Sequence, residues 1–283
     1  MKICYLVLLH HKFDQAKRLI YRLAGPQTSF VIHIDAKVDQ FVVEKFKQDI
    51  GQVKSAYYTK RINVKWGAFN QAEAIMETIV HAVDAELSCD RFILISGQDY
   101  PIVSNDEIFK FISNNPHKEY IEAYALNLID DKTKVWTPFY RFMRYHFWLG
   151  NKRISTSLII KKVPNIPLFH GATWWLLTSE CVHFIASAYV KNKDLKRFFR
   201  TGFLVDEAYI PSLVMSSPFS KNVTGHNVTY ADWKNPSGPH PKTLGKSNIP
   251  DIVSSKCLFA RKLDLDFDAE IFDLLDSKTL SSV

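Results

Sequence analysis

The sequence predicts an α/β fold with a central, mostly parallel sheet flanked by helices, and two strand–helix units near its start carry most of that signal. Residues 3–9 form an apolar run typical of a buried strand. The polar stretch after it has apolar residues at helical spacing, at Phe13, Ala16, Leu19, Ile20 and Leu23. Residues 30–35 repeat the pattern, a β-branched run that ends in an acid and precedes a helix-like stretch. Such a succession favours parallel strands joined by right-handed crossovers.

The alternation continues with a strand, a helix and a strongly apolar strand, at about residues 53–58, 70–85 and 91–96. In an open α/β sheet the ligand crevice lies beyond the carboxyl ends of the strands. We therefore expect His10, Asp35 and Asp99 around one rim, with Asp99 in a loop over residues 97–101. Ordinary caps and turns would also place polar residues at these positions.

The second half of the chain is less regular. Residues 130–170 show no clear period and are interpreted as a loop region, and residues 132–162 hold eight Lys or Arg and no Asp or Glu. The aromatic side chains interleaved with them are costly to expose, so the acceptor, a membrane surface or the protein's own core must cover them. Further helices and strands are expected over residues 174–189, 206–217 and 257–276.

Length and composition agree with one ordinary globular enzyme domain. The 283 residues are interpreted as a single domain with a nucleotide-binding half, 1–125, and an acceptor-binding and catalytic half, 126–283. A net charge of +7 favours an anionic partner without deciding among nucleic acid, a phosphorylated substrate and an acidic membrane. No recognisable nucleic-acid-binding motif is present, so we expect no nucleic-acid partner.

The cysteines and the N-terminal segment indicate where the protein works. Cys4, Cys89, Cys181 and Cys257 are far apart in the sequence and lack metal-ligand spacing, which indicates buried thiols in a reducing compartment. The apolar run at residues 3–9 is shorter than the roughly 20 residues that span a bilayer, and no signal-peptide cleavage pattern follows it. We expect a cytoplasmic protein, either free or attached peripherally to a membrane.

Three groups of charged residues are candidates for chemistry. Asp264, Asp266 and Asp268 alternate as in a metal loop, but acids that open a helix more often cap it or face solvent, and no metal is expected there. Lys242 and Lys262 are separated by a flexible stretch that could fold over a diphosphate. Two close cation–phosphate contacts of about 4 kcal/mol each would replace a bound metal. Both lysines could equally be ordinary surface residues.

Seven blocks of sequence resemble the core-2/I-branching β-1,6-N-acetylglucosaminyltransferase and peptide O-xylosyltransferase family, glycosyltransferase family 14. In chain order they are LLHHKFDQAKRL, VIHIDAK, VKWGAFNQAEA, FILISGQDYPIVSND, HGATWWLLTSE, VDEAYIPSLV and CLFARKLD. They cover nearly the whole chain. The resemblance implies a GT-A-like variant of the α/β fold, a UDP-sugar donor, an inverting mechanism that forms a β linkage, and no metal or other cofactor.

The resemblance also implies roles for individual residues. Glu207 matches the catalytic base of the branching enzymes, although Asp206 and Glu207 could instead only cap a helix. Lys262 matches the diphosphate-binding lysine, and Lys242 lies where a second basic group is found. The remaining matches are Asp35 with a uridine-contacting aspartate, Leu9 and His10 with the site of the base, Glu122 and Arg144 with acceptor-binding residues, and Trp174 and Trp175 with the wall of the sugar subsite or, alternatively, the strand core.

The chain departs from the family pattern in places. The xylosyltransferases carry an acid where this chain has Thr173, which favours Glu207 as the base, yet the LGNKRI and FARK segments are closer to the xylosyltransferases. GlcNAc is therefore the first candidate for the transferred sugar, with xylose or a non-catalytic carbohydrate-binding relative as alternatives. The absence of the secreted members' anchor and disulfides suggests a bacterial enzyme of surface-polysaccharide synthesis, with a glycan or lipid-linked oligosaccharide as acceptor.

Overall fold

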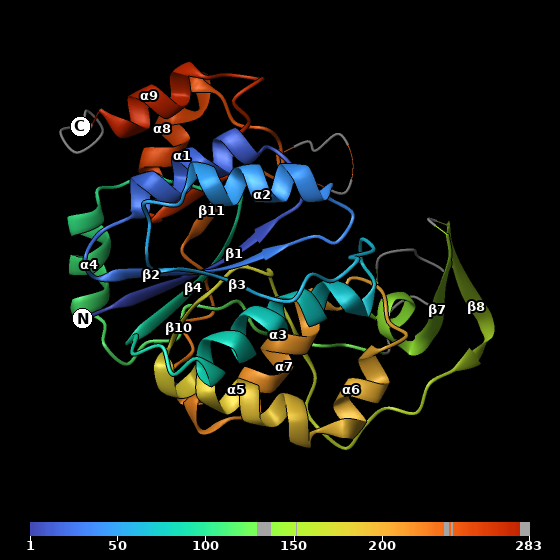
Figure 1. The fold of residues 1–283 in the computed structure, drawn as a ribbon. Coiled ribbons are helices and arrows are strands. Elements are labelled where there is room, and N and C mark those ends of the chain that lie inside the picture. The colour runs from blue at the N-terminus through green and yellow to red at the C-terminus, as the bar shows by residue number, and fades with distance from the viewer. Residues whose placement is uncertain (129–136, 151, 235–237, 239, 278–283) are drawn as a thin grey trace.

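The structure is a computed structural model that describes the chain except for residues 129–136, 151, 235–237, 239 and 278–283 (Figure 1). Its centre is a five-stranded sheet in the order β10-β4-β1-β2-β3. These strands are β1 (Ile3–Leu9), β2 (Thr28–Ile34), β3 (Ala56–Tyr58), β4 (Arg91–Ser96) and β10 (Leu176–Thr178). β1 pairs in parallel with β2 and β4, β2 pairs in parallel with β3, and only β10 of these strands runs antiparallel. The predicted mostly parallel sheet is confirmed.

Helices cover both faces of this sheet (Figure 1). The alternation of side chains along β1 explains the two layers, because Tyr5 and Val7 enter one apolar core while Cys4 and Leu6 enter the other. α1 (Phe13–Leu23), α2 (Gln40–Asp49) and α9 (Glu270–Asp276) supply the first core. α3 (Phe69–Asp84), α5 (Ser179–Lys191), α6 (Lys193–Phe199) and α7 (Asp206–Met215) supply the second. The predicted helical arrangement around the sheet is confirmed.

Shorter elements complete the chain. They are β5 (Tyr100–Pro101), α4 (Asn105–Ser113), β6 (Tyr124–Ala125), β9 (Phe169–His170), η2 (Pro218–Asn222), β11 (Thr229–Ala231), η3 (Lys246–Asn248), α8 (Ile249–Ser254) and β12 (Phe259–Arg261). β5, β11 and β12 form a small second sheet in which β12 lies between the other two. This pairing joins the end of the chain to the segment after β4. The predicted loop over residues 97–101 thus ends in a short strand.

The interpretation of residues 130–170 as a loop region is wrong for residues 139–149 and 152–160, whereas residues 161–168 lie in no helix or strand. A π-helical turn, η1 (Phe139–Met143), leads into an antiparallel hairpin of β7 (Arg144–Leu149) and β8 (Lys152–Ile160). Leu149 pairs with Lys152 across a two-residue connection in which Gly150 has a φ of 58°. Glycine adopts such a backbone without steric cost, which suits a tight hairpin turn. The part of the prediction on residues 130–136 and 151 lies outside the described residues.

The described helices contain no segment long and apolar enough to cross a bilayer. All four cysteines are free thiols, and three of them are buried while Cys257 is half-buried. The predicted division into halves 1–125 and 126–283 stays a prediction. The structure does place residues of both ranges in each of the two cores.

Candidate active site

The carboxyl ends of β1 and β2 bring the predicted nucleotide-contacting residues together. The backbone N–H of Asp35 donates to the carbonyl of Leu9 over 2.8 Å, so the two strand ends lie side by side. The Asp35 carboxylate is buried and accepts from the N–H of Lys37 over 2.9 Å. The Leu9 side chain is packed into the core, so its backbone is the part of this residue that faces the rim.

His10 follows Leu9 at this rim. Its ring stacks on His11 with the centroids 3.9 Å apart. Although the residue is exposed, crowding by protein atoms and the neighbouring His11 lower the pKa of His10 to about 4, against the opposing effect of Asp35. The charges of Lys37 and Lys262 also lower this pKa. His10 is therefore neutral at pH 7, beside an anionic and a cationic group.

Lys242 and Lys262 are brought together as the sequence predicts, at the level of the backbone. The N–H of Lys262 donates to the carbonyl of Lys242, and the N–H of Leu244 donates to the carbonyl of Lys262 over 2.8 Å. Burial and the adjacent Arg261 lower the pKa of Lys262. Among the described residues its ammonium forms no ion pair, whereas the ammonium of Lys242 lies 3.6 Å from the buried Asp232 carboxylate. Lys262 is thus a cation available to an anionic ligand.

The expectation that Asp99 faces the rim is wrong. Its carboxylate is fully buried and accepts from both the N–H and the hydroxyl of Ser96 over 2.6 Å. The Arg261 guanidinium lies 3.2 Å from the other oxygen and stacks 3.8 Å from the ring centroid of Trp174. Asp99 does follow the end of β4, as predicted, but its carboxylate pairs with Arg261, the residue that precedes Lys262 in the chain. Asp99 therefore positions this segment and does not meet a ligand.

Glu207 lies in the first turn of α7, and its environment makes it a weak acid. Burial raises its pKa to about 7, with Asp206 and Glu122 acting in the same direction and Arg141 opposing them. Its side chain keeps 35% of its surface exposed, so a ligand can reach it. A carboxyl group with a pKa near neutral is suited to accept a proton at physiological pH.

Arg141 is a site residue that sequence reasoning missed. Its Nη2 donates to Glu207 Oε2 over 2.7 Å and to the carbonyl of Leu204 over 2.8 Å. Arg141 belongs to η1, in the region interpreted as a loop, so no periodicity singled it out. Arg144, predicted from the same segment to bind the acceptor, places its guanidinium over the ring of Tyr140, and its role in acceptor binding stays a prediction.

The residue before the candidate base is fixed from two sides. Asp206 is buried, and its Oδ2 accepts from Gln71 Nε2 and from the Thr173 hydroxyl, each over 2.8 Å. Burial raises the pKa of Asp206. Thr173 stands where the xylosyltransferases carry an acid, and here it serves as a hydrogen-bond donor to the neighbour of Glu207. Its role is to hold the start of α7.

Glu122, predicted to bind the acceptor, lies near enough to Glu207 to raise its pKa. Its Oε1 accepts from Asn227 Nδ2 over 2.6 Å, and its Oε2 accepts from the N–H of Ala172 over 3.2 Å. The N–H of Gly171 donates to the carbonyl of Glu207 over 2.8 Å. A Cβ on Gly171 would lie 2.1 Å from the carbonyl oxygen of Glu122, so only glycine allows this approach.

Of the two predicted tryptophans, Trp175 is a core residue with 1% of its surface exposed, and Trp174 is half-buried under Arg261. Trp174 follows Thr173, so it connects the Lys262 segment with the start of α7. A second connection is aromatic. The Trp66 ring contacts the rings of Phe203 and His240, at centroid distances of 5.4 and 5.7 Å. These rings link the segment of His240 with Phe203, whose carbonyl accepts from Arg141 Nε.

The acidic run near the C-terminus is occupied by protein contacts. The Lys12 ammonium pairs with both Asp264 and Asp266. Asp268 accepts from the N–H of Lys246 over 2.8 Å and from that of Ile271. Within the described part of the chain, no three His, Cys, Asp or Glu residues are grouped so that they could hold a metal. The predicted capping and solvated roles of the run agree with these contacts.

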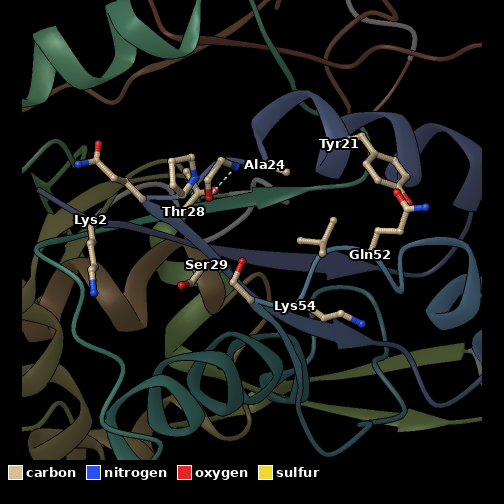
Figure 2. Close-up of a pocket in the computed structure, with 12 residues that line it drawn as sticks. Lys2, Tyr21, Ala24, Thr28, Ser29, Gln52 and Lys54 are labelled. Carbon is tan, nitrogen blue, oxygen red and sulfur yellow. Dashed lines mark hydrogen bonds between the residues drawn. The ribbon is translucent and has the colours of Figure 1, made fainter.

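A recess of about 510 Å³ opens at the other end of the sheet, beside the amino ends of β1 and β2 (Figure 2). Thr28 and Ser29 line it, and the side chains of Lys2 and Lys54 point away from one another there. Its lining contains no carboxylate, His or Cys, so it gathers no groups for acid–base chemistry or metal binding. The carboxyl edge is the candidate active site.

This fold and site define a class of α/β protein that combines a weakly acidic carboxyl, Glu207, with a lysine, Lys262, that forms no ion pair within the described residues. Residues 3–257 match the family model of the Core-2/I-Branching enzyme, and the chain belongs to that family. It is 21% identical to rat xylosyltransferase 2 over 98% of this chain and 33% of that protein. It is also 21% identical to mouse N-acetyllactosaminide beta-1,6-N-acetylglucosaminyl-transferase, over 93% of this chain and 69% of that protein.

The chain spans about a third of the length of the xylosyltransferase 2 proteins that it matches. Solved structures resemble it only distantly. Mouse xyloside xylosyltransferase 1 covers 82% of this chain and 89% of its own, with a TM-score of 0.40 and 10% identity. A putative glucose-1-phosphate thymidylyltransferase of Bacillus anthracis covers 70% and 78%, with a TM-score of 0.32 and 14% identity. These scores are too low to carry an argument.

Proposed function

We propose that this protein is an inverting, metal-independent glycosyltransferase with a GT-A-like fold, which moves a sugar from a UDP-sugar to a hydroxyl of a glycan or glycolipid. Glu207 carries the proposal, because its carboxyl has a pKa of about 7 and is accessible to a ligand. Family membership over residues 3–257 supports it.

In this mechanism Glu207 accepts the proton of the acceptor hydroxyl as the oxygen attacks the anomeric carbon from the side opposite UDP. One bond forms and one breaks in a single displacement, so an α-linked donor gives a β-linked product. A base is most effective when its pKa lies near the working pH. Arg141 holds the Oε2 atom of Glu207 and leaves Oε1 to take the proton.

The departing UDP gains negative charge on its diphosphate, which must be stabilised. Lys262 supplies an ammonium that forms no ion pair within the described residues, and its pKa is lowered by burial and by Arg261. An anion at this position would relieve the repulsion between the two cations. The backbone of Lys242 is hydrogen-bonded to that of Lys262. Its ammonium lies 3.6 Å from the Asp232 carboxylate, which partly neutralises it. Asp35, His10 and the backbone of Leu9 are left to contact the uridine.

The base assignment is tested with Glu207→Gln, which keeps the hydrogen-bonding shape and removes the proton acceptor. We expect the turnover number to fall by about a hundredfold or more, within the range attributed to general base catalysis, while UDP binding measured by calorimetry is unchanged.

The matched control is Glu180→Gln, because Glu180 is likewise an acid in the first turn of a helix, α5, but lies outside the site. It should keep full turnover. Full turnover by a folded Glu207→Gln protein would show that Glu207 only caps α7.

Metal independence is tested separately with a chelator. Because Lys262 and Lys242 are proposed to neutralise the diphosphate, activity should survive an excess of EDTA, and Lys262→Ala should reduce it strongly in the presence or absence of manganese. Loss of activity with EDTA that manganese restores would assign the diphosphate to a cation instead.

Two donor sugars are candidates. GlcNAc is the first candidate, since Thr173 replaces the acid of the xylosyltransferases and donates to Asp206. UDP-xylose is the alternative, supported by relatives named xylosyltransferase that match 98% of this chain. Initial rates with the two donors decide between them, and no transfer or hydrolysis of either would favour a non-catalytic carbohydrate-binding relative.

A further inference from the structure

The hairpin of β7 and β8 projects from the body of the protein beside α6 (Figure 1). Residues that are opposite each other in an antiparallel pair point to the same face, and successive residues along a strand point to opposite faces. The hairpin therefore has an outer and an inner face with different side chains. Phe147 pairs with Ile154 and Leu149 pairs with Lys152 on the outer face. His146 and Ser155, and Trp148 and Arg153, are opposite each other on the inner face.

The inner face is tied to the active site. The Arg153 guanidinium lies 3.5 Å from the ring centroid of Phe203, the N–H of His146 donates to the carbonyl of Thr201 over 2.9 Å, and η1, which carries Arg141, leads directly into β7. These contacts fix the hairpin relative to Glu207. The outer face is therefore held in one orientation at the side of the candidate active site.

The outer face exposes large apolar side chains. Phe147, Leu149 and Ile154 have 50%, 74% and 47% of their surface exposed. The Tyr145 ring stacks on that of Phe147 and extends the apolar strip toward the base of the hairpin. A cross-strand apolar cluster next to the turn is costly in water and indicates a binding surface.

The charge around this strip is strongly positive. Residues 144–162 contain five Lys or Arg and no acid, and residues 191–200, which include α6, contain five and one acid, while the whole chain has a net charge of +7. Lys152 and Lys162 are exposed. The two segments are adjacent, because the Lys161 ammonium donates to the carbonyl of Phe198 in α6 over 3.0 Å. The chain's positive charge is thus concentrated beside its exposed apolar strip.

We propose that the outer face of the β7–β8 hairpin, formed by Phe147, Leu149, Ile154 and Lys152, docks the protein on an anionic lipid membrane. Apolar side chains that enter the interface, surrounded by Lys and Arg that meet anionic headgroups, are the two contributions that bind a peripheral protein to a membrane. A second copy of the chain would bring the same positive charge against this face. Nucleic acid would satisfy the charges but leave Leu149 and Phe147 in water.

Docking in this orientation has a consequence that rests on the proposed function. The inner face of the hairpin contacts Phe203, which lies near the start of α7, so Glu207 would be held close to the membrane surface. An acceptor carried on a lipid would then reach the base without leaving the bilayer. Membrane binding itself requires no catalysis and is tested apart from it.

The test is co-sedimentation with vesicles of phosphatidylcholine alone and of equal parts of phosphatidylcholine and phosphatidylglycerol. We expect binding only to the anionic vesicles, weakened by added salt. Phe147→Ser with Leu149→Ser should lower the association constant by about tenfold or more, since both side chains lose their burial in the interface. Lys152→Gln should lower it roughly fivefold.

Matched controls come from α2, on another part of the surface. Phe41 is 76% exposed and Lys45 is exposed, so Phe41→Ser and Lys45→Gln remove side chains of the same kind without touching the hairpin. Both controls should bind as the unmodified protein does. Thermal unfolding of every variant should match that of the unmodified protein, because all the substituted side chains are exposed.

The proposal is overturned if the protein does not prefer anionic vesicles, or if the hairpin variants bind them as tightly as the controls do. It is also overturned if a single-stranded oligonucleotide binds the unmodified protein more tightly than vesicles do, or if the hairpin variants abolish a dimer seen by sedimentation without vesicles. Glu207→Gln should bind vesicles normally and the hairpin variants should keep UDP-sugar hydrolysis, so failure of docking and failure of the proposed function are distinguishable.

Discussion

At the scale of single residues, the pair formed by Glu207 and Arg141 shows which electrostatic effect dominates. An arginine within ion-pair distance ordinarily lowers the pKa of a carboxyl by about 1 to 3 units. The distance here is 2.7 Å, yet the pKa of Glu207 is raised to about 7. Burial, together with Asp206 and Glu122, therefore outweighs the arginine. By lowering the pKa of Glu207, Arg141 keeps a larger fraction of this carboxyl deprotonated near pH 7.

This balance predicts how activity depends on pH when Arg141 is changed. In Arg141→Gln the opposing positive charge is lost, so the pKa of Glu207 rises above its value of about 7. Because the base must be deprotonated, the acid limb of kcat/KM should move to higher pH by about 1 to 2 units. The measurement is the pH profile with a saturating acceptor.

Arg141→Lys, which keeps the charge, should restore part of the original profile. A fall in activity with an unmoved acid limb in Arg141→Gln would mean that the arginine only supports the carbonyls of Phe203 and Leu204, to which it also donates.

At the scale of elements, the sequence predicts a strand or helix correctly where the strand is an unbroken apolar run or the helix keeps its apolar residues at helical spacing. β1 is apolar along its whole length, and β4 is apolar from Phe92 to Ile95, because helices cover both faces of the sheet; α1 has its buried residues at helical spacing. The strand β7 was missed because its apolar residues neither form an unbroken run nor alternate regularly with polar ones. Its outer face carries Phe147 and Leu149 and its inner face carries Trp148, so apolar residues fall on both faces and conceal the period of two. The hairpin depends on Gly150 and on contacts with Phe203 that are distant in sequence.

The candidate site divides in the same way. Asp35 and His10 follow from strand ends, since parallel strands finish at one edge of a sheet. Glu207 and Lys262 were assigned by family resemblance, and the structure shows that their surroundings differ from those of surface residues. Arg141 and Asp99 could not be placed, because their partners Glu207 and Arg261 lie 66 and 162 residues away. Only tertiary packing decides whether such charges face a ligand or each other.

A prediction at this scale concerns the contact between the HGATWW segment and α7. In Gly171→Ala the new methyl group would lie 2.1 Å from the Glu122 carbonyl oxygen, so the segment or Glu122 must move. We expect a loss of about 1–3 kcal/mol in the free energy of unfolding, the usual cost of overpacking. Activity should fall as well, because Gly171 also donates to the carbonyl of Glu207. Chemical denaturation and initial rates measure the two effects.

Gly25→Ala is the matched control, since a methyl group there would have its nearest neighbour at 4.0 Å. It should change stability by no more than a few tenths of a kcal/mol and leave activity intact. Equal effects of the two substitutions would contradict the role given to Gly171.

At the scale of the whole molecule, like charges are gathered at both ends of the site. Lys262 lies beside Arg261, and Glu207 lies beside Asp206 and Glu122. Such groupings reduce the stability of the ligand-free protein, and they persist in proteins because function requires them. An anionic donor would relieve the first grouping, and protonation relieves the second. The stability of the molecule should therefore depend on pH through its active site.

Glu207→Gln makes this dependence measurable. The folded-state pKa of Glu207, about 7, is above its ordinary value of 4.5, so the stability that its protonated form contributes is fully present below about pH 4.5 and is lost as the pH rises through 7. Glutamine resembles the protonated form at every pH. The variant should therefore gain stability over the unmodified protein between pH 4.5 and 8, reaching about 1–2 kcal/mol once the one-third exposure of the side chain is allowed for. Chemical denaturation across that range measures the gain. A stability difference for Glu207→Gln that does not change with pH would mean that burial does not raise the pKa of the Glu207 carboxyl.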